Sequence, residues 1–265
     1  MKDLRTSSNR VRHGLAVSTA LLVITILVIS MVFGITADRK TNQASTTRPK
    51  QANVEAVEWD SPQLPTFYPT CNGSDLEALQ EAFQETLNVT AHARSRIMAY
   101  GSNDQIYQRW FGDGSIYTVL GTLEAVAEIP KEDALFRCDD IDGLCAANPN
   151  YYAGHHRSNA TQETVICDYF YVAKLPASKM CSNGTVASVA PSKFMGIDMI
   201  HRLFHVPTMS LNEYIGEYTE DVDEILAMAK TNSSFAIRNV DSYLYYLYDV
   251  YSNVIQSGGC LGDIE

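Results

Sequence analysis

The stretch Asp198-Met199-Ile200-His201-Arg202-Leu203-Phe204-His205 places two histidines four residues apart. It predicts a helix that ends before Pro207, because proline cannot continue a helix. Residues four apart on a helix share one face, with Cβ atoms about 5–6 Å apart. Two imidazoles placed in this way can bind one tetrahedral zinc ion at about 2.0–2.1 Å. The stretch therefore predicts a zinc site at His201 and His205, and the alternative is a pair of partly buried, hydrogen-bonded histidines.

Arg202 follows the first of these histidines. In the metalloprotease form of such a helix this position is Glu, whose carboxylate takes the proton from zinc-bound water. A guanidinium stays protonated and has no acceptor lone pair, so it cannot be that base. It could instead pair with a carboxylate, hold an anion near the metal, or point to solvent. Arg202 thus argues against ordinary peptide hydrolysis and not against zinc.

The segments around this helix predict an α+β domain with more helix than sheet. A capping box at Ser74-Asp75-Leu76-Glu77 predicts the start of one helix. Apolar spacing predicts two more helices, over Glu220–Lys230 and Asp241–Ile255. Strand-like runs are fewer and cover Ile116–Leu120 and Thr164–Val172.

The N-terminal part of the chain predicts a membrane segment. Residues 14–37 contain no charged side chain, and as a helix of about 1.5 Å per residue they are long enough to span the bilayer core. The basic residues within positions 1–13 favour a cytoplasmic tail, which makes residues 14–37 a signal-anchor. The alternative is a signal peptide cleaved after Ala37. Both interpretations place the rest of the chain across the membrane, as a cell-surface protein or as a secreted one.

Residues 38–65 are rich in polar residues and proline, which predicts a flexible stalk. Residues 66–265 then form the ectodomain. Two features agree with an extracellular address, six cysteines that predict three disulfides and five glycosylation sequons. The cysteines are Cys71, Cys138, Cys145, Cys167, Cys181 and Cys260, and the sequons begin at Asn72, Asn88, Asn159, Asn183 and Asn232.

Charge limits the class of partner. The residues after position 37 hold 16 of the 20 basic and 30 of the 31 acidic side chains, a formal net charge of −14. Such a surface repels nucleic acid and anionic lipid. We therefore expect no nucleic-acid partner.

Three stretches together carry a family resemblance: AGHHRSNATQETVIC (Ala153–Cys167), DMIHRLFH (Asp198–His205) and EYTEDVDEILAMAKTNSS (Glu217–Ser234). They resemble the fungal zincophore family, also called the pH-regulated antigen or HRxxH family, which is related to the deuterolysin-type zinc endopeptidases. The resemblance runs from Cys71 to Cys260. It implies a zincin-like fold and a secreted or surface protein that captures zinc.

The resemblance also implies site residues. In such a fold the third zinc ligand follows the histidine helix, and the candidates are Glu217 and Glu220. His155 matches the family's AGH motif, where it either lines the site or is a structural hydrogen-bonding histidine. No function is carried over to His156, since relatives usually have an aromatic residue there. Proximity and the family pattern together suggest the disulfides Cys138–Cys145, Cys167–Cys181 and Cys71–Cys260.

The leading hypothesis is a cell-surface zinc-binding protein without ordinary peptidase activity. One alternative is an active zinc metalloendopeptidase whose base comes from elsewhere, for instance whichever of Glu217 and Glu220 is not a ligand. Another is an adhesion or host-interaction module with structural zinc. The expected partners are the zinc ion and the membrane, with a zinc transporter or host surface proteins as further candidates. The chain ends without histidine, which weakens the case for delivery to a transporter.

Overall fold

The computed structural model describes residues 54–264. The predicted cytoplasmic tail, the membrane segment and the stalk up to residue 53 lie outside the described residues. Within residues 54–264, no helix combines the length and the apolar character that a membrane crossing requires.

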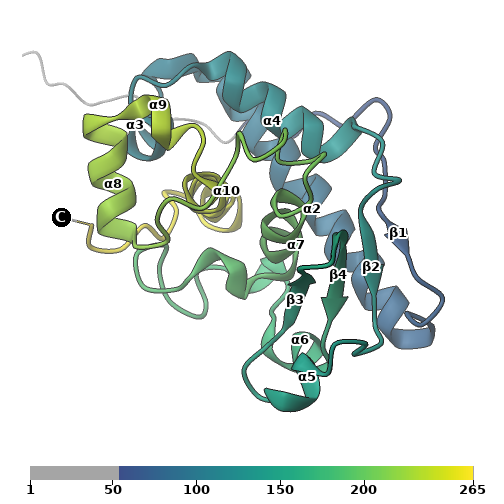
Figure 1. Cartoon of the computed structure of the whole chain (residues 1–265). Coiled ribbons are helices and arrows are strands. Elements are labelled where there is room, and N and C mark those ends of the chain that lie inside the picture. The colour runs from purple at the N-terminus through teal and green to yellow at the C-terminus, as the bar shows by residue number, and fades with distance from the viewer. Residues whose placement is uncertain (1–53, 265) are drawn as a thin grey trace, which may run out of the picture. The chain divides into compact units, whose positions relative to one another are not determined.

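Three helices that pack on one another build the core. They are α2 (Gly73–Tyr100), α7 (Met195–Phe204) and α10 (Val240–Ile255), and each packs against the other two. Figure 1 shows α7 next to α2, with the small sheet beside them. Along α2, Leu79, Phe83 and Leu87 recur every four residues and are buried, so one apolar stripe faces the core. The other helices are α3 (Gln105–Phe111), α4 (Ile116–Glu128), α5 (Leu144–Ala147), α6 (Asp168–Ala173), α8 (Val222–Thr231) and α9 (Ser233–Ala236).

A four-stranded mixed sheet lies beside these helices. Its strands are β1 (Thr66–Phe67), β2 (Leu135–Arg137), β3 (Gly154–Arg157) and β4 (Ala160–Ile166), in the spatial order β1-β2-β4-β3. The β1–β2 and β2–β4 pairs are parallel, and β3 is antiparallel to β4. The prediction of a mainly helical α+β domain with a small sheet is confirmed.

Several local predictions hold, and others are wrong. The helices expected at Asp198–His205, Glu220–Lys230 and Asp241–Ile255 are α7, α8 and α10, each within two or three residues of the expected bounds. The capping box is wrong, because α2 begins at Gly73 with Asn72 at the N-cap position, and Ser74 lies inside the first turn.

Both strand predictions need correction. Ile116–Leu120 opens helix α4, whose buried Val119, Leu123 and Val126 recur at helical spacing over a longer window than the expected strand. The run Thr164–Val172 is a strand only to Ile166, and α6 starts at Asp168, where an acid in the first turn favours a helix. Short apolar runs do not distinguish strand from helix by periodicity alone.

The folded domain begins before the predicted boundary at residue 66. Trp59 is 9% exposed, and its Nε1 donates to the Leu87 carbonyl at 3.0 Å. The amide of Gln63 donates to the carbonyl of Ala127 at 2.9 Å. The end of the predicted stalk thus packs on α2 and α4, since one buried tryptophan outweighs the polar composition around it.

All six cysteines form disulfides, as predicted, but the predicted pairing is wrong. The pairs are Cys71–Cys138, Cys145–Cys167 and Cys181–Cys260. Parallel pairing of β1 with β2 aligns the chain before Cys71 with the chain before Cys138. Tertiary pairing therefore decides this bridge, and proximity along the sequence does not.

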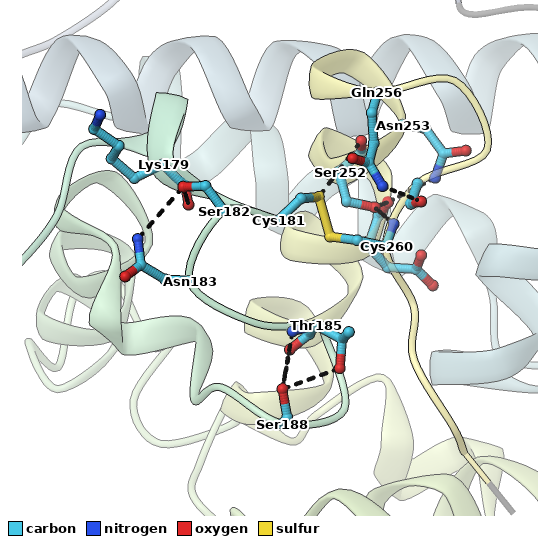
Figure 2. The surroundings of a disulfide bond; sticks show 12 residues. Lys179, Cys181, Ser182, Asn183, Thr185, Ser188, Ser252, Asn253, Gln256 and Cys260 are labelled. Atoms are coloured by element: carbon cyan, nitrogen blue, oxygen red, sulfur yellow. Dashed lines mark hydrogen bonds between the residues drawn. A yellow bond between two sulfur atoms is a disulfide. The ribbon is translucent and has the colours of Figure 1, made fainter.

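The Cys181–Cys260 bridge ties the C-terminal segment to the loop after α6 (Figure 2). The Cys260 amide donates to Ser252 Oγ at 3.3 Å, which joins this segment to the end of α10. The amide of Val186 donates to the Cys260 carbonyl at 2.9 Å.

The five sequon asparagines, Asn72, Asn88, Asn159, Asn183 and Asn232, all lie on the surface. Their exposure permits attachment of glycans, and glycosylation itself stays a prediction.

Replacing both partners of one bridge tests the disulfide network. We expect Cys181→Ser/Cys260→Ser to lower the free energy of unfolding by about 2–4 kcal/mol, because an unlinked chain gains conformational freedom when it unfolds. Urea denaturation measures the loss. Peptide mapping of the wild-type chain without reduction should recover Cys181 linked to Cys260, and recovery of Cys167 linked to Cys181 would contradict the structure.

Candidate metal centre

Helix α7 positions both histidines by burying its opposite face. Its buried apolar residues fix the rotation of the helix, and they are Ile197, Met199, Ile200, Leu203 and Phe204. Gly196 lets α7 approach α2 closely, because a Cβ there would lie 2.8 Å from Glu85 Cβ. Thr86 Oγ1 also donates to the Gly196 carbonyl at 2.7 Å. His201 and His205 are consequently held on the outward face.

His201, His205 and Glu217 bring three donor atoms together. His201 Nε2 lies 3.0 Å from His205 Nε2 and 2.6 Å from Glu217 Oε1. His205 Nε2 lies 3.2 Å from the same oxygen. Bonds of about 2.0–2.1 Å would set neighbouring donors of a tetrahedral zinc about 3.3 Å apart. The three donors therefore fit around one zinc ion with small movements.

Asn239 fixes the segment that carries Glu217. Its buried side chain accepts from the amides of Tyr218 and Thr219 at 3.0 and 3.2 Å. Its Nδ2 donates to the Thr219 carbonyl at 3.0 Å. The backbone of Gly216 pairs with the chain on both sides of Asn239, accepting from Val240 and donating to Arg238. The carboxylate of Glu217 is thereby held over α7.

The environment of Glu217 favours its charged form. Hydrogen bonds with His201 and then His205 hold the pKa of the Glu217 carboxyl far below its usual value, against a smaller opposing effect of burial. An ionised carboxylate between two imidazoles is the state that binds a metal cation.

Two further titratable groups interact with the donor residues. The ring of His156, on β3, lies 4.4 Å from the ring of His205, measured between centroids. Burial first, and then the charge of His205, lower the pKa of His156 to about 2, so its imidazole is neutral. Burial raises the pKa of Asp241, in the first turn of α10, to about 6.

Arg202 is buried and pairs with Asp198. Its Nε donates to Asp198 Oδ2 at 2.7 Å, and Lys174 Nζ donates to Asp198 Oδ1 at 2.7 Å. Arg202 and Asp198 are 7% and 2% exposed. The guanidinium lies against β3, where a Cβ on Gly154 would be 2.5 Å from Nη1. Of the three possibilities left open by the sequence, pairing with a carboxylate is the one that the structure contains.

The other predicted site residues lie elsewhere. Glu220 is exposed and lies outside the His201–His205–Glu217 donor group, although its charge helps to raise the pKa of Asp241. His155 belongs to a separate group with Cys145 and Cys167.

Sequence reasoning missed three residues near the donors: His156, Asn239 and Asp241. Adjacent residues of a strand face opposite sides, so one of the two neighbouring histidines must face α7. Only the register of β3 against β4 decides that it is His156. The sequence carries no comparable signal for Asn239.

A cavity of about 510 Å³ opens beside the donors, with His205 and Glu217 in its wall. Its lining is mixed, with the apolar residues Phe204, Ile215 and Val240 beside polar ones such as Thr161 and Ser210. A molecule bound here would lie directly against two of the three donor residues.

The sequence profile of the HRXXH family, described as "Putative peptidase family", matches residues 17–263. The chain belongs to the HRXXH family. The resemblance inferred from the three motif stretches is thereby confirmed. The helix that carries His201, Arg202 and His205 matches the motif in the family's name.

Two relatives of this HRXXH protein support the assignment. Protein ZPS1 of Saccharomyces cerevisiae is 51% identical over 213 residues, which cover 80% of this chain and 86% of that protein. The pH-regulated antigen PRA1 of Candida albicans is 32% identical over 199 residues, which cover 73% of this chain and 66% of that one.

Among solved structures, a zinc peptidase from Grifola frondosa is similar with a TM-score of 0.48 and 17% identity, over 68% of this chain and 97% of that one. A similarity of this size says nothing about activity, and the zincin-like character of the fold stays a prediction.

Removing Asp198 should strongly destabilise the HRXXH domain. Asp198→Ala leaves Arg202 and Lys174 buried without their carboxylate, and breaking a buried pair costs about 3–5 kcal/mol. Glu124→Ala is the control, since Glu124 pairs with Arg94 at 3.6 Å with 49% of its side chain exposed. That exposed pair contributes at most about 1 kcal/mol. Urea denaturation compares the two variants, and equal losses would show that the buried pair is not important for stability.

Proposed function

We propose that this protein binds one zinc ion outside the cell through His201, His205 and Glu217, and that it is not an ordinary peptidase. The observation that carries the proposal is the convergence of two imidazole nitrogens and one carboxylate oxygen within 2.6–3.2 Å of one another. Three disulfides support an extracellular address, because such bridges persist in oxidising compartments.

The donor types favour zinc over hard cations. Calcium and magnesium prefer sites made mainly of oxygen ligands, whereas imidazole suits zinc and other transition metals. Two histidines with one carboxylate are also a common protein ligand set for zinc. When bound, the ion would supply a Lewis-acidic charge beside the 510 Å³ cavity.

The surroundings of Arg202 support the absence of peptidase activity. Its side chain donates a hydrogen bond to Asp198, and Lys174 donates to the same carboxylate. A glutamate at this position would meet the buried Asp198 carboxylate as a like charge. The arginine is therefore part of the packing of α7, and exchanging it for Glu would not simply restore a base.

Asp241 supports a second candidate, a zinc metalloendopeptidase. Burial raises the pKa of Asp241, whose carboxyl also interacts electrostatically with His201 and Glu217, and such a shift is typical of general acid–base groups. The base in this alternative would be Asp241, because Glu217 is the proposed third ligand and Glu220 lies outside the donor group. A membrane anchor, an adhesion role, and partners such as a zinc transporter or host proteins stay predictions.

Four single substitutions test the zinc ligands. His201→Ala, His205→Ala and Glu217→Ala should each weaken zinc binding by more than about 100-fold, because removing a direct ligand costs more than the 10–100-fold typical of an outer-shell change. Glu220→Ala is the matched control and should keep one zinc per chain. Calorimetric titration with zinc measures both. Loss of zinc in Glu220→Ala, together with retention of zinc in Glu217→Ala, would show that the third ligand is Glu220 and that the proposed assignment is wrong.

Peptidase activity separates the two candidates. Zinc-loaded wild-type protein should give no chelator-sensitive hydrolysis of a broad peptide library, because no carboxylate follows His201. Turnover that chelation abolishes would overturn the non-peptidase proposal. Loss of such turnover in Asp241→Asn, with zinc still bound, would establish the second candidate.

A further inference from the structure

A second cluster of metal-binding side chains includes His155, the neighbour of His156 on β3. It consists of Cys145, His155 and Cys167, and their sulfur and nitrogen donors lie within 4.8 Å of one another. Cys145 is on α5, His155 is on β3, and Cys167 follows β4 immediately before α6. Figure 1 shows these four elements together at one end of the sheet. The two cysteines form a disulfide with a Cα–Cα distance of 5.4 Å.

The surroundings of His155 leave one of its ring nitrogens available to bind a metal ion. Its side chain is only 10% exposed, and its Nε2 lies 3.4 Å from Asp142 Oδ2. A carboxylate accepts, so this contact places the proton on Nε2 and leaves a lone pair on Nδ1. Nδ1 is buried and has no hydrogen-bond partner among the described residues. A histidine whose other nitrogen donates to a carboxylate is the usual arrangement of a zinc ligand.

We propose that reduction of the Cys145–Cys167 disulfide creates a second zinc site from the two thiolates and the imidazole of His155. Two molecules of a small thiol supply the two electrons, and they leave joined as their own disulfide. The two protons of the small thiols pass to the cysteine sulfurs. Zinc then displaces these protons and binds both thiolates.

The surroundings give the sulfurs room to separate. Zinc–sulfur bonds of about 2.3 Å require the two sulfurs to move about 3.8 Å apart. A cavity of about 300 Å³ borders both cysteines, with Asp140 and Asp168 in its wall. Rotation of the two side chains into this space meets the requirement.

The chemistry is particular to this bridge. Among residues 54–264, the clusters of three or more metal-binding side chains include neither Cys71–Cys138 nor Cys181–Cys260. Reduction of those two bridges would therefore create no comparable zinc site. The proposal is independent of the zinc site at His201, His205 and Glu217.

Cobalt absorption tests the proposal, because a thiolate bound to cobalt gives an intense near-ultraviolet charge-transfer band. The experiment uses the full chain carrying His201→Ala and His205→Ala, so that only the second site is observed. Oxidised protein should show no band. After treatment with a phosphine reductant, one equivalent of cobalt should give the band, and one equivalent of zinc should remove it.

Matched variants decide which residues are responsible. Cys145→Ser/Cys167→Ser should abolish the band, whereas Cys71→Ser/Cys138→Ser should keep it. His155→Gln should weaken cobalt binding at least tenfold. His92→Gln is its control, since His92 also has a buried Nδ1 without a hydrogen-bond partner and should leave the affinity unchanged.

A second measurement covers the case in which reduction loosens the domain. In protein whose three bridges have all been reduced by the phosphine, zinc should slow alkylation of Cys145 and Cys167 at least tenfold. The alkylation rates of the other four cysteines should stay unchanged. A band that survives Cys145→Ser/Cys167→Ser would overturn the proposal. So would equal cobalt affinity in His155→Gln and His92→Gln, or alkylation that zinc does not change.

Discussion

The carboxylate of Asp198 holds together the part of the molecule that carries the metal donors. It binds Arg202 one helical turn along α7 and Lys174 at the end of α6, so one buried anion joins two elements. Burial alone would raise the pKa of Asp198, but Arg202 and then Lys174 outweigh it, and the pKa stays below the usual value. The same anion holds the side chain of the residue after His201, because Arg202 Nε donates to Asp198 Oδ2. The same contact therefore links the orientation of α7 to the residue between the two histidines.

The two halves of the donor set are positioned by different means. His201 and His205 need only the helical repeat, together with the apolar face that packs α7 on α2 and α10. Glu217 lies on a loop, and a loop residue is placed only if its backbone is fixed. The side-chain amide of Asn239 fixes this backbone through hydrogen bonds with three backbone groups of residues 218 and 219. Asn239 is fully buried, and it is as important for the arrangement as the donors themselves.

The sequence predicted what depends on short periodic patterns. The spacing of His201 and His205, the stop at Pro207 and the apolar faces of α8 and α10 are local properties, and these predictions agree with the structure. Ile116–Leu120 failed because a five-residue window hides the longer repeat of α4. The disulfide pairing failed because parallel strand pairing, and not chain proximity, brings Cys71 to Cys138. The choice between His155 and His156 depended on one residue of register in β3, which the sequence does not contain.

X-ray absorption at the zinc edge tests the central claim most directly. Oxidised full chain, loaded with one equivalent of zinc, would be measured without added thiol. The proposed site predicts a shell of nitrogen and oxygen neighbours at about 2.0–2.2 Å, with outer-shell scattering from two imidazoles. A sulfur neighbour at about 2.3 Å, or scattering from fewer than two imidazoles, would contradict binding by His201, His205 and Glu217.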